Sequence, residues 1–146
     1  MKKIALSTLA VAACAVAFAW ASPAAAKVTT YGLTLDGKQE TPPNTSAGSG
    51  TGTVTYDDAT KEMTYTITYS GLTGPATAAH FHGPAAAGAA AGVVVGVTGS
   101  VASPITGKAT LTDGQAKDLA DGMLYFNVHT AANPKGEIRG QVLAKP

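Results

Sequence analysis

Cysteine is almost absent from this chain, which limits both its stabilisation and its chemistry. The one cysteine, Cys14, lies in an apolar N-terminal stretch, so residues 27–146 contain none. This region therefore has no disulfide and no thiolate, and a blue-copper site is excluded because it needs a cysteine ligand. Charged residues are also few, at 13%, and form no basic cluster, which argues against nucleic acid or an anionic membrane as the partner.

The first 26 residues have the pattern of a secretory signal peptide. Two lysines precede an uncharged run from Ile4 to Trp20, and small residues at Ala24 and Ala26 form an A-x-A cleavage site. The run is shorter than the roughly 20 apolar residues of a membrane-spanning helix, and it ends in a processing site. We expect cleavage after Ala26 and a periplasmic or secreted mature protein of residues 27–146.

Two other kinds of processing stay open. Ala21 offers a weaker cleavage site, and Val11-Ala12-Ala13-Cys14 resembles a bacterial lipoprotein cleavage site. Lipidation of Cys14 would tether the protein to a membrane. The residues that follow stay apolar through Trp20, whereas a lipoprotein usually turns polar there, so we favour a free exported domain.

Removal of the signal leaves 120 residues, with eight Lys and Arg against nine Asp and Glu. The formal net charge of this part is −1. Its length suits a single domain, residues 27–146, with its own hydrophobic core.

Alternation of apolar and polar residues with a period of two dominates this domain. Between Met63 and Tyr69 the apolar residues occupy one face and threonines the other, which is typical of a half-buried strand. The run Thr51–Tyr56 alternates similarly, and Asp57–Lys61 between them indicates a hairpin turn. Further strands are predicted at Val28–Leu35, Ala76–His82, Gly92–Val97, Gly107–Leu111, Gly122–Thr130 and Glu137–Leu143.

One short helix is predicted at Gln115–Ala120, capped by Thr112 or Asp113 and ended by Gly122. Short strands at regular spacing with turn signals between them predict an all-β fold. We expect a single antiparallel, Greek-key-like β-sandwich of about eight strands with one short helix, preceded by a cleaved signal peptide. The low-complexity run Ala85–Gly92 is expected to be a flexible surface loop.

Three histidines are the candidates for chemistry. His80 and His82 lie two apart on a predicted strand, so they share a face with Cα atoms roughly 6.5–7 Å apart. His129 lies near the end of another strand, on the face of Asn127 and opposite an apolar face of Leu, Phe and Val. If the two strands are neighbours, three imidazoles converge on a site suited to copper or zinc. Otherwise the histidines only bond to the backbone of nearby loops.

A second polar group follows on the last strand. Glu137, Arg139 and Gln141 share a face, and we expect Glu137 and Arg139 to pair with each other or with Glu40, locking the last strand to the N-terminal region. In a functional alternative, Glu137 or Asn127 orients an imidazole through its other ring nitrogen. No nucleophile-base pair or carboxylate pair stands out.

Four motifs occur in order along the domain: LDGKQETPP at 35–43, AHFHGPA at 79–85, YFNVHT at 125–130 and NPKGEIRGQ at 133–141. Together they resemble the CHRD domain, which is repeated in the developmental protein chordin and occurs alone in exported bacterial proteins. The resemblance spans Leu33 to Leu143 and implies a β-sandwich. In chordin-type proteins the repeats sit beside growth-factor-binding modules, which implies a role in protein interaction.

The resemblance also bears on the histidines. All three occupy positions of the family motifs, and His80-Phe81-His82-Gly83 is similar to the copper-binding strand of copper-zinc superoxide dismutase. We therefore predict an exported metal-binding protein whose ligands are His80, His82 and His129. Copper is the expected metal and zinc the alternative. The other hypotheses are a metal-free structural or interaction module for other exported proteins and, ranked last, a dismutase-like copper enzyme.

Overall fold

The structure, a computed structural model, describes residues 26–146. The expected signal peptide lies outside the described residues apart from its last residue, and so does Cys14. Among the described residues, no helix is long and apolar enough to cross a membrane.

Strands dominate the described part of the chain, as the alternation predicts. Each of the eight predicted strands is present with ends shifted by a few residues, whereas η1 and β9 were not predicted. The elements are β1 Val28–Asp36, the 3-10 helix η1 Gly37–Gln39, β2 Ser49–Asp57, β3 Glu62–Ser70, β4 Ala76–His82, β5 Val93–Gly96, β6 Ile105–Thr110, α1 Asp113–Ala120, β7 Tyr125–Thr130, β8 Ile138–Gln141 and β9 Leu143–Ala144.

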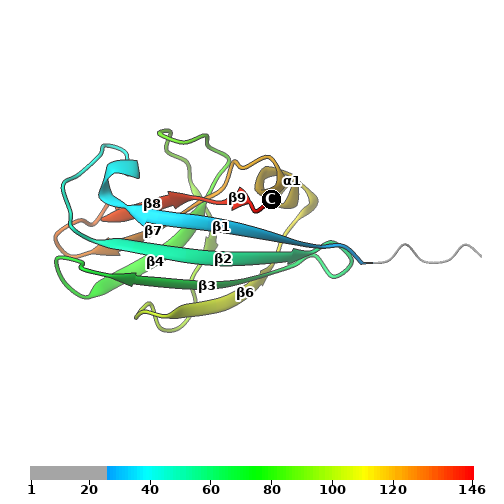
Figure 1. Cartoon of the computed structure of the whole chain (residues 1–146), viewed down its shortest axis with the longest axis horizontal. Coiled ribbons are helices and arrows are strands. Elements are labelled where there is room, and N and C mark those ends of the chain that lie inside the picture. Colours follow the sequence, from blue (N-terminus) through cyan, green and yellow to red (C-terminus); the bar gives the residue numbers. More distant parts are fainter. Residues whose placement is uncertain (1–25) are drawn as a thin grey trace, which may run out of the picture.

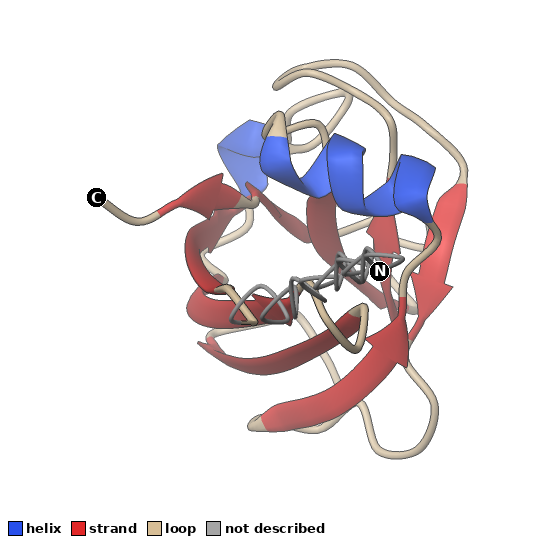
Figure 2. Ribbon diagram, turned by 90° about the vertical axis from the view of Figure 1, so that its right-hand side faces the viewer, coloured by secondary structure: helices blue, strands red, loops and turns tan. Residues whose placement is uncertain are grey.

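The strands pair antiparallel in the order β5-β4-β7-β8-β1-β2-β3-β6, with β9 beside β1. A single residue pair, Asp36 with Arg139, joins β8 to β1, so the sheet bends at that point into two facing halves. The strands wrap around a common interior with α1 lying across one end (Figures 1 and 2). The predicted antiparallel all-β sandwich is confirmed, and it is nearly closed into a barrel.

The apolar positions of the two halves meet in one core. Tyr65 and Ile67 of β3 are at most 5% exposed, and Phe81 and Phe126 of β4 and β7 are fully buried. The ring of Tyr65 packs edge-on against Phe81 at 5.0 Å, and Phe81 packs against Phe126 at 4.7 Å. Burial of each such side chain contributes about 1.5–3 kcal/mol, so this core is the main stabilising contact between the halves.

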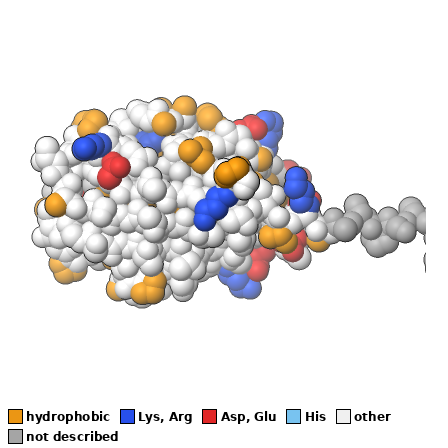
Figure 3. All heavy atoms as spheres, viewed as in Figure 1, with side chains coloured by type: hydrophobic (Ala, Val, Ile, Leu, Met, Phe, Trp, Pro, Cys, Tyr) orange, Lys and Arg blue, Asp and Glu red, His pale blue; other side chains and the backbone are white. Residues whose placement is uncertain are grey.

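The outward positions of β1 to β3 carry threonine rather than charge. Thr51, Thr53, Thr66 and Thr68 are exposed, whereas the residues between them face the core or are glycine. On the face over these strands, charged side chains are therefore few across the middle (Figure 3). This half of the sandwich contains none of the histidines.

The helix α1 begins where the cap residue predicts. Thr112 is the N-cap: its Oγ1 accepts from the Gln115 amide at 3.2 Å, and Gln115 Oε1 accepts from the Thr112 amide at 2.9 Å. This reciprocal capping satisfies two helix-end donors. Asp113, the other candidate cap, is the first helical residue.

The loop Ala85–Gly92 lies at the surface as expected, with residues 86–90 exposed, and backbone carbonyls near its start anchor it. Gln141 Nε2 donates to the Ala85 carbonyl at 2.8 Å, and Arg139 donates to that of Ala86 at 3.4 Å. A run of alanine and glycine gives no sign of this anchoring, because the loop takes part through its backbone carbonyls. The side chains that donate to these carbonyls lie far along the chain. The loop covers the polar face of β7 and β8.

The expected ion pair of Glu137 is also wrong. Its carboxylate is fully buried and accepts from Ser46 Oγ (2.6 Å), the Thr73 amide (2.7 Å), Thr73 Oγ1 (2.7 Å) and Thr130 Oγ1 (2.5 Å). We call Ser46, Thr73 and Thr130 the Glu137 cage. Arg139, 2% exposed, instead donates to Thr41 Oγ1 at 3.0 Å. Three hydroxyl-bearing residues thus stabilise the Glu137 carboxylate, where the sequence predicted a cation.

Candidate metal centre

The register of β4 and β7 brings the three histidines to one place. The two strands are antiparallel neighbours, with His80 opposite Asn127 and His82 opposite Tyr125. Because side chains alternate along a strand, the histidines share the face away from Phe81 and Phe126. His129 lies diagonally across from His80, next to the pair on β4. The structure therefore confirms that the three rings meet.

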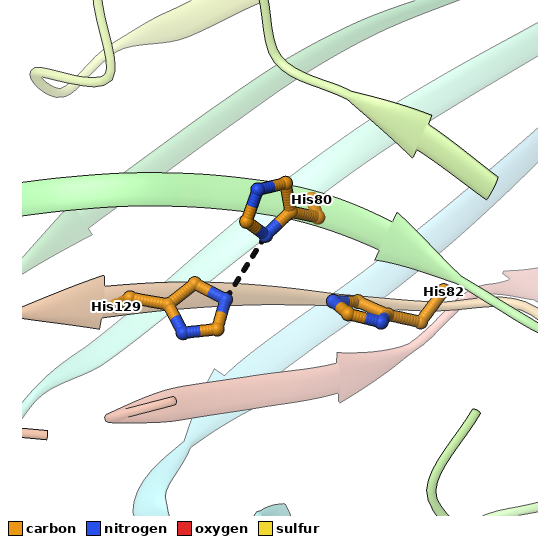
Figure 4. Close-up of side chains that lie close together, drawn as sticks. All are labelled: His80, His82 and His129. Carbon is orange, nitrogen blue, oxygen red and sulfur yellow. Dashed lines mark hydrogen bonds between the residues drawn. The ribbon is translucent and has the colours of Figure 1, made fainter. Parts of the chain in front are cut away.

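The rings present their nitrogens to one another (Figure 4). His80 Nδ1 and His129 Nε2 are 3.0 Å apart, and a ring nitrogen of His82 points toward this pair. One nitrogen from each histidine lies within 4.8 Å of those of the other two. At this spacing, a metal ion could bind one nitrogen of each imidazole after small side-chain adjustments. We call these three residues the histidine cluster.

Two backbone carbonyls select the nitrogens that face the centre. His82 Nδ1 lies 3.0 Å from the Ala91 carbonyl oxygen, and His129 Nδ1 lies 3.1 Å from that of Pro134. A carbonyl oxygen only accepts, so in both residues Nδ1 carries the proton and donates. This is the usual support of a metal-binding histidine, because it leaves Nε2 to bind the ion.

His80 is the third candidate ligand, and it faces the other two histidines with Nδ1 rather than Nε2. Its Nδ1 donates to the His129 Nε2 lone pair in the absence of an ion. Neutral imidazole can carry its proton on either nitrogen, so a shift of that proton to Nε2 frees Nδ1 as a ligand. The cluster thus offers two Nε2 atoms and one Nδ1 atom without requiring any residue to become an anion.

Burial keeps two of the rings neutral. It lowers the pKa of His80, and the neighbouring His129 and His82 lower it further. Burial also lowers the pKa of His129, although the hydrogen bond to the Pro134 carbonyl acts in the opposite direction and His82 adds to the lowering. The neutral form is the one that binds a metal ion.

The cluster is only partly open to solvent. His80 and His129 are half-buried, whereas His82 is 9% exposed. The loop Ala85–Gly92 and the paired strand β5 lie beside His82, which accounts for its lower exposure. An ion would enter from the side of His80 and His129.

The floor beneath His82 is built from three residues of β7 and β8. Its ring stacks on Tyr125 with centroids 4.9 Å apart and planes at 4°, and the Arg139 guanidinium carbon lies 3.4 Å from the Tyr125 ring centroid. Asn127 Oδ1 lies 3.1 Å from His82 Nε2. Sequence reasoning named Asn127 as a partner of an imidazole but missed Tyr125, although it shares that face. The alternative role of Glu137, to orient an imidazole, is wrong, because its carboxylate is bonded to the Glu137 cage.

The fold and this cluster define a class: a small antiparallel β-sandwich with a candidate three-histidine site on its outer face. Within that class, the CHRD domain profile matches residues 31–142, so the chain belongs to the CHRD domain family. No curated protein and no solved structure matches the chain. The likeness to the dismutase strand therefore rests on the His-x-His-Gly motif alone.

Proposed function

We propose that this protein is an exported metal-binding CHRD domain that holds one copper ion at His80, His82 and His129. One observation carries the proposal: ring nitrogens from two neighbouring strands lie within 4.8 Å of one another. Two of the rings are already turned by backbone carbonyls so that Nε2 faces the centre. Family membership fits this proposal, because the histidines lie within the matched range, residues 31–142.

The donor set supports copper ahead of other ions. Imidazole nitrogen suits copper and zinc, and among divalent first-row ions a given site of this kind binds Cu²⁺ most tightly. Zinc is the alternative, since three histidines with an open position also suit it. The proposed role is copper handling or storage outside the cytoplasm, with the ion entering and leaving from the solvent side.

A second function is favoured by a specific contact. The direct bond between His80 and His129 links β4 to β7 without any ion. The cluster would then stabilise a structural or interaction module, and removal of a histidine would lower stability equally with and without copper.

A titration of the purified protein with copper distinguishes the two. We expect one equivalent to bind, with nitrogen hyperfine structure in the electron paramagnetic resonance spectrum, and the His80→Ala/His82→Ala variant to lose this binding. Thr66→Ala, an exposed change on the opposite half, is the control and keeps it. A wild-type protein without stoichiometric uptake of copper or zinc would overturn the proposal in favour of the structural role.

A further inference from the structure

Asn127 occupies the centre of the metal site rather than its edge. On β7 it lies directly opposite His80 and two residues before His129, so it shares their face. Its side chain is 3% exposed, and its Oδ1 lies 3.1 Å from His82 Nε2. The amide oxygen therefore borders the same small space as the three imidazoles.

The four candidate donors form two close pairs. His80 Nδ1 and His129 Nε2 are 3.0 Å apart, and His82 Nε2 and Asn127 Oδ1 are 3.1 Å apart. Four donors around one tetrahedral ion, with bonds of roughly 2.0–2.1 Å, lie about 3.3 Å from one another. Each pair thus has nearly the separation of one tetrahedral edge, and the two pairs share no donor, as opposite edges must.

Glu40 holds the amide with its oxygen toward the histidines. Glu40 is 6% exposed, and its Oε1 is buried without a hydrogen-bond partner of normal geometry. A Cβ placed on Gly136 would lie 2.3 Å from Glu40 Oε1 and 2.8 Å from Asn127 Nδ2, so both atoms border that point. Nδ2 of the Asn127 amide therefore lies on the Glu40 side, and Oδ1 faces the histidine cluster.

Two acceptors face each other here without a proton between them. His82 Nδ1 carries the ring proton and donates to the Ala91 carbonyl, so Nε2 presents a lone pair to Asn127 Oδ1 at 3.1 Å. Two buried lone pairs at this distance repel each other unless a cation binds both. A metal ion coordinated by Nε2 and Oδ1 satisfies both acceptors at once.

We infer that Asn127 Oδ1 is the fourth ligand of the copper site, which makes it a three-nitrogen, one-oxygen site with Glu40 as the positioning residue. This inference rests on the proposed function and deepens it: the site is four-coordinate from the protein alone, and Asn127 contributes to its affinity and ligand field.

The test uses copper and, as a spectroscopic probe of coordination, Co²⁺ with the purified protein. Asn127→Val removes the oxygen with little change of volume. We expect Cu²⁺ affinity to fall about 10- to 100-fold. The wild-type Co²⁺ absorption should be the intense band of a four-coordinate tetrahedral ion, and it should change in Asn127→Val. Asn127→Asp, which keeps an oxygen at this place, should retain that band with a shifted maximum.

A matched control separates ligation from structure. Asn44 also bonds through its amide, to the Glu137 carbonyl and the Ser46 amide, away from the cluster. Asn44→Val should lower the melting temperature without changing the metal spectrum. If Asn127→Val fails to fold, Asn127→Asp and Glu40→Gln decide: a changed ligand field in either one supports the inference, and unchanged spectra in both overturn it.

The two proposals fail differently. If the wild-type protein binds neither copper nor Co²⁺, the proposed function is wrong. If the wild-type protein binds, and the folded Asn127→Val variant binds with the same spectrum and an affinity within about twofold, the metal site stands and Asn127 is not its ligand.

Discussion

Two buried glutamates show how differently one residue type is used in this domain. Glu137 is fully buried and Glu40 is 6% exposed. Burial raises the pKa of Glu137, but its bonds to Ser46, Thr130 and Thr73 outweigh this and lower it to about 2. Burial raises the pKa of Glu40 to about 7, because the amide of Thr41, the charge of Arg139 and the amide of Asn127 offset it only in part.

The number of hydrogen-bond donors, rather than burial, accounts for the different pKa values of the two glutamates. The Glu137 cage supplies four hydrogen bonds, so the carboxylate stays charged and ties the loops at Ser46 and Thr73 to the start of β8. Glu40 has an oxygen without a partner and lies behind Asn127, next to the histidine cluster. A stable fold tolerates such an unsatisfied group mainly where it serves a site.

The largest expected effect is the loss of the caged carboxylate. Glu137→Ala leaves buried hydroxyl and amide donors unpaired, so we expect the free energy of unfolding to fall by about 3 kcal/mol or more. Urea unfolding measures this. Glu62→Ala is the control, because Glu62 forms an exposed pair with Lys108 at 2.9 Å, for which about 1 kcal/mol or less is expected. Equal losses in the two variants would remove the structural role of the cage.

Copper binding at the histidine cluster should stabilise the folded protein, and this stabilisation should not depend on the Glu137 cage. At a free copper concentration 100 times Kd, binding to the folded state raises the free energy of unfolding by about 2.7 kcal/mol. Thermal melts with and without copper should show this increase in the wild type and in Ser46→Ala, which removes a hydrogen bond of the cage and the acceptor of the Gly48 amide but no contact of the histidine cluster. It should vanish in His80→Ala/His82→Ala, and its persistence there would place the metal elsewhere.

Glu40→Gln should have the opposite sign from Glu137→Ala. The unfolded carboxyl loses its proton near pH 4.5 and the folded one near pH 7, so this group destabilises the fold increasingly as pH rises through that range. Removing the charge should stabilise the metal-free protein by about 1 kcal/mol at pH 8 and have little effect at pH 4. Unfolding at both pH values is the measurement, and a loss of stability at pH 8 would contradict it.

The smallest effect is the pH dependence of the metal-free cluster. The pKa values of His80 and His129 are lowered on folding, so the unfolded chain takes up protons that the folded one resists. The contribution of these two histidines to stability should be fully present above about pH 6.5 and decline as pH falls below that value. A His80→Gln/His129→Gln variant should lose this decline between pH 7.5 and 5.5, and an unchanged profile would assign it to other groups.

Local patterns predicted the elements well, for reasons seen in particular residues. Tyr65 and Ile67 alternate with exposed threonines on β3, and Thr112 caps α1, because both features depend on neighbours within a few positions. The face of His129 followed from the same alternation. The anchoring of Ala85–Gly92, the stack of Arg139 on Tyr125 and the cage around Glu137 were not predicted. Their partners come from other segments, between 7 residues away for Thr130 of the cage and 91 for Ser46, so no local pattern specifies them.

The sequence by itself determined an antiparallel β domain of the CHRD family and the faces on which its histidines lie, because side-chain direction on a strand follows from position alone. Only the tertiary structure decided that β4 and β7 are neighbours in a register that brings three imidazoles and Asn127 together. Strand pairing is a long-range choice, made by the packing of Phe81 and Phe126 in the core, and the site on the opposite face is its consequence.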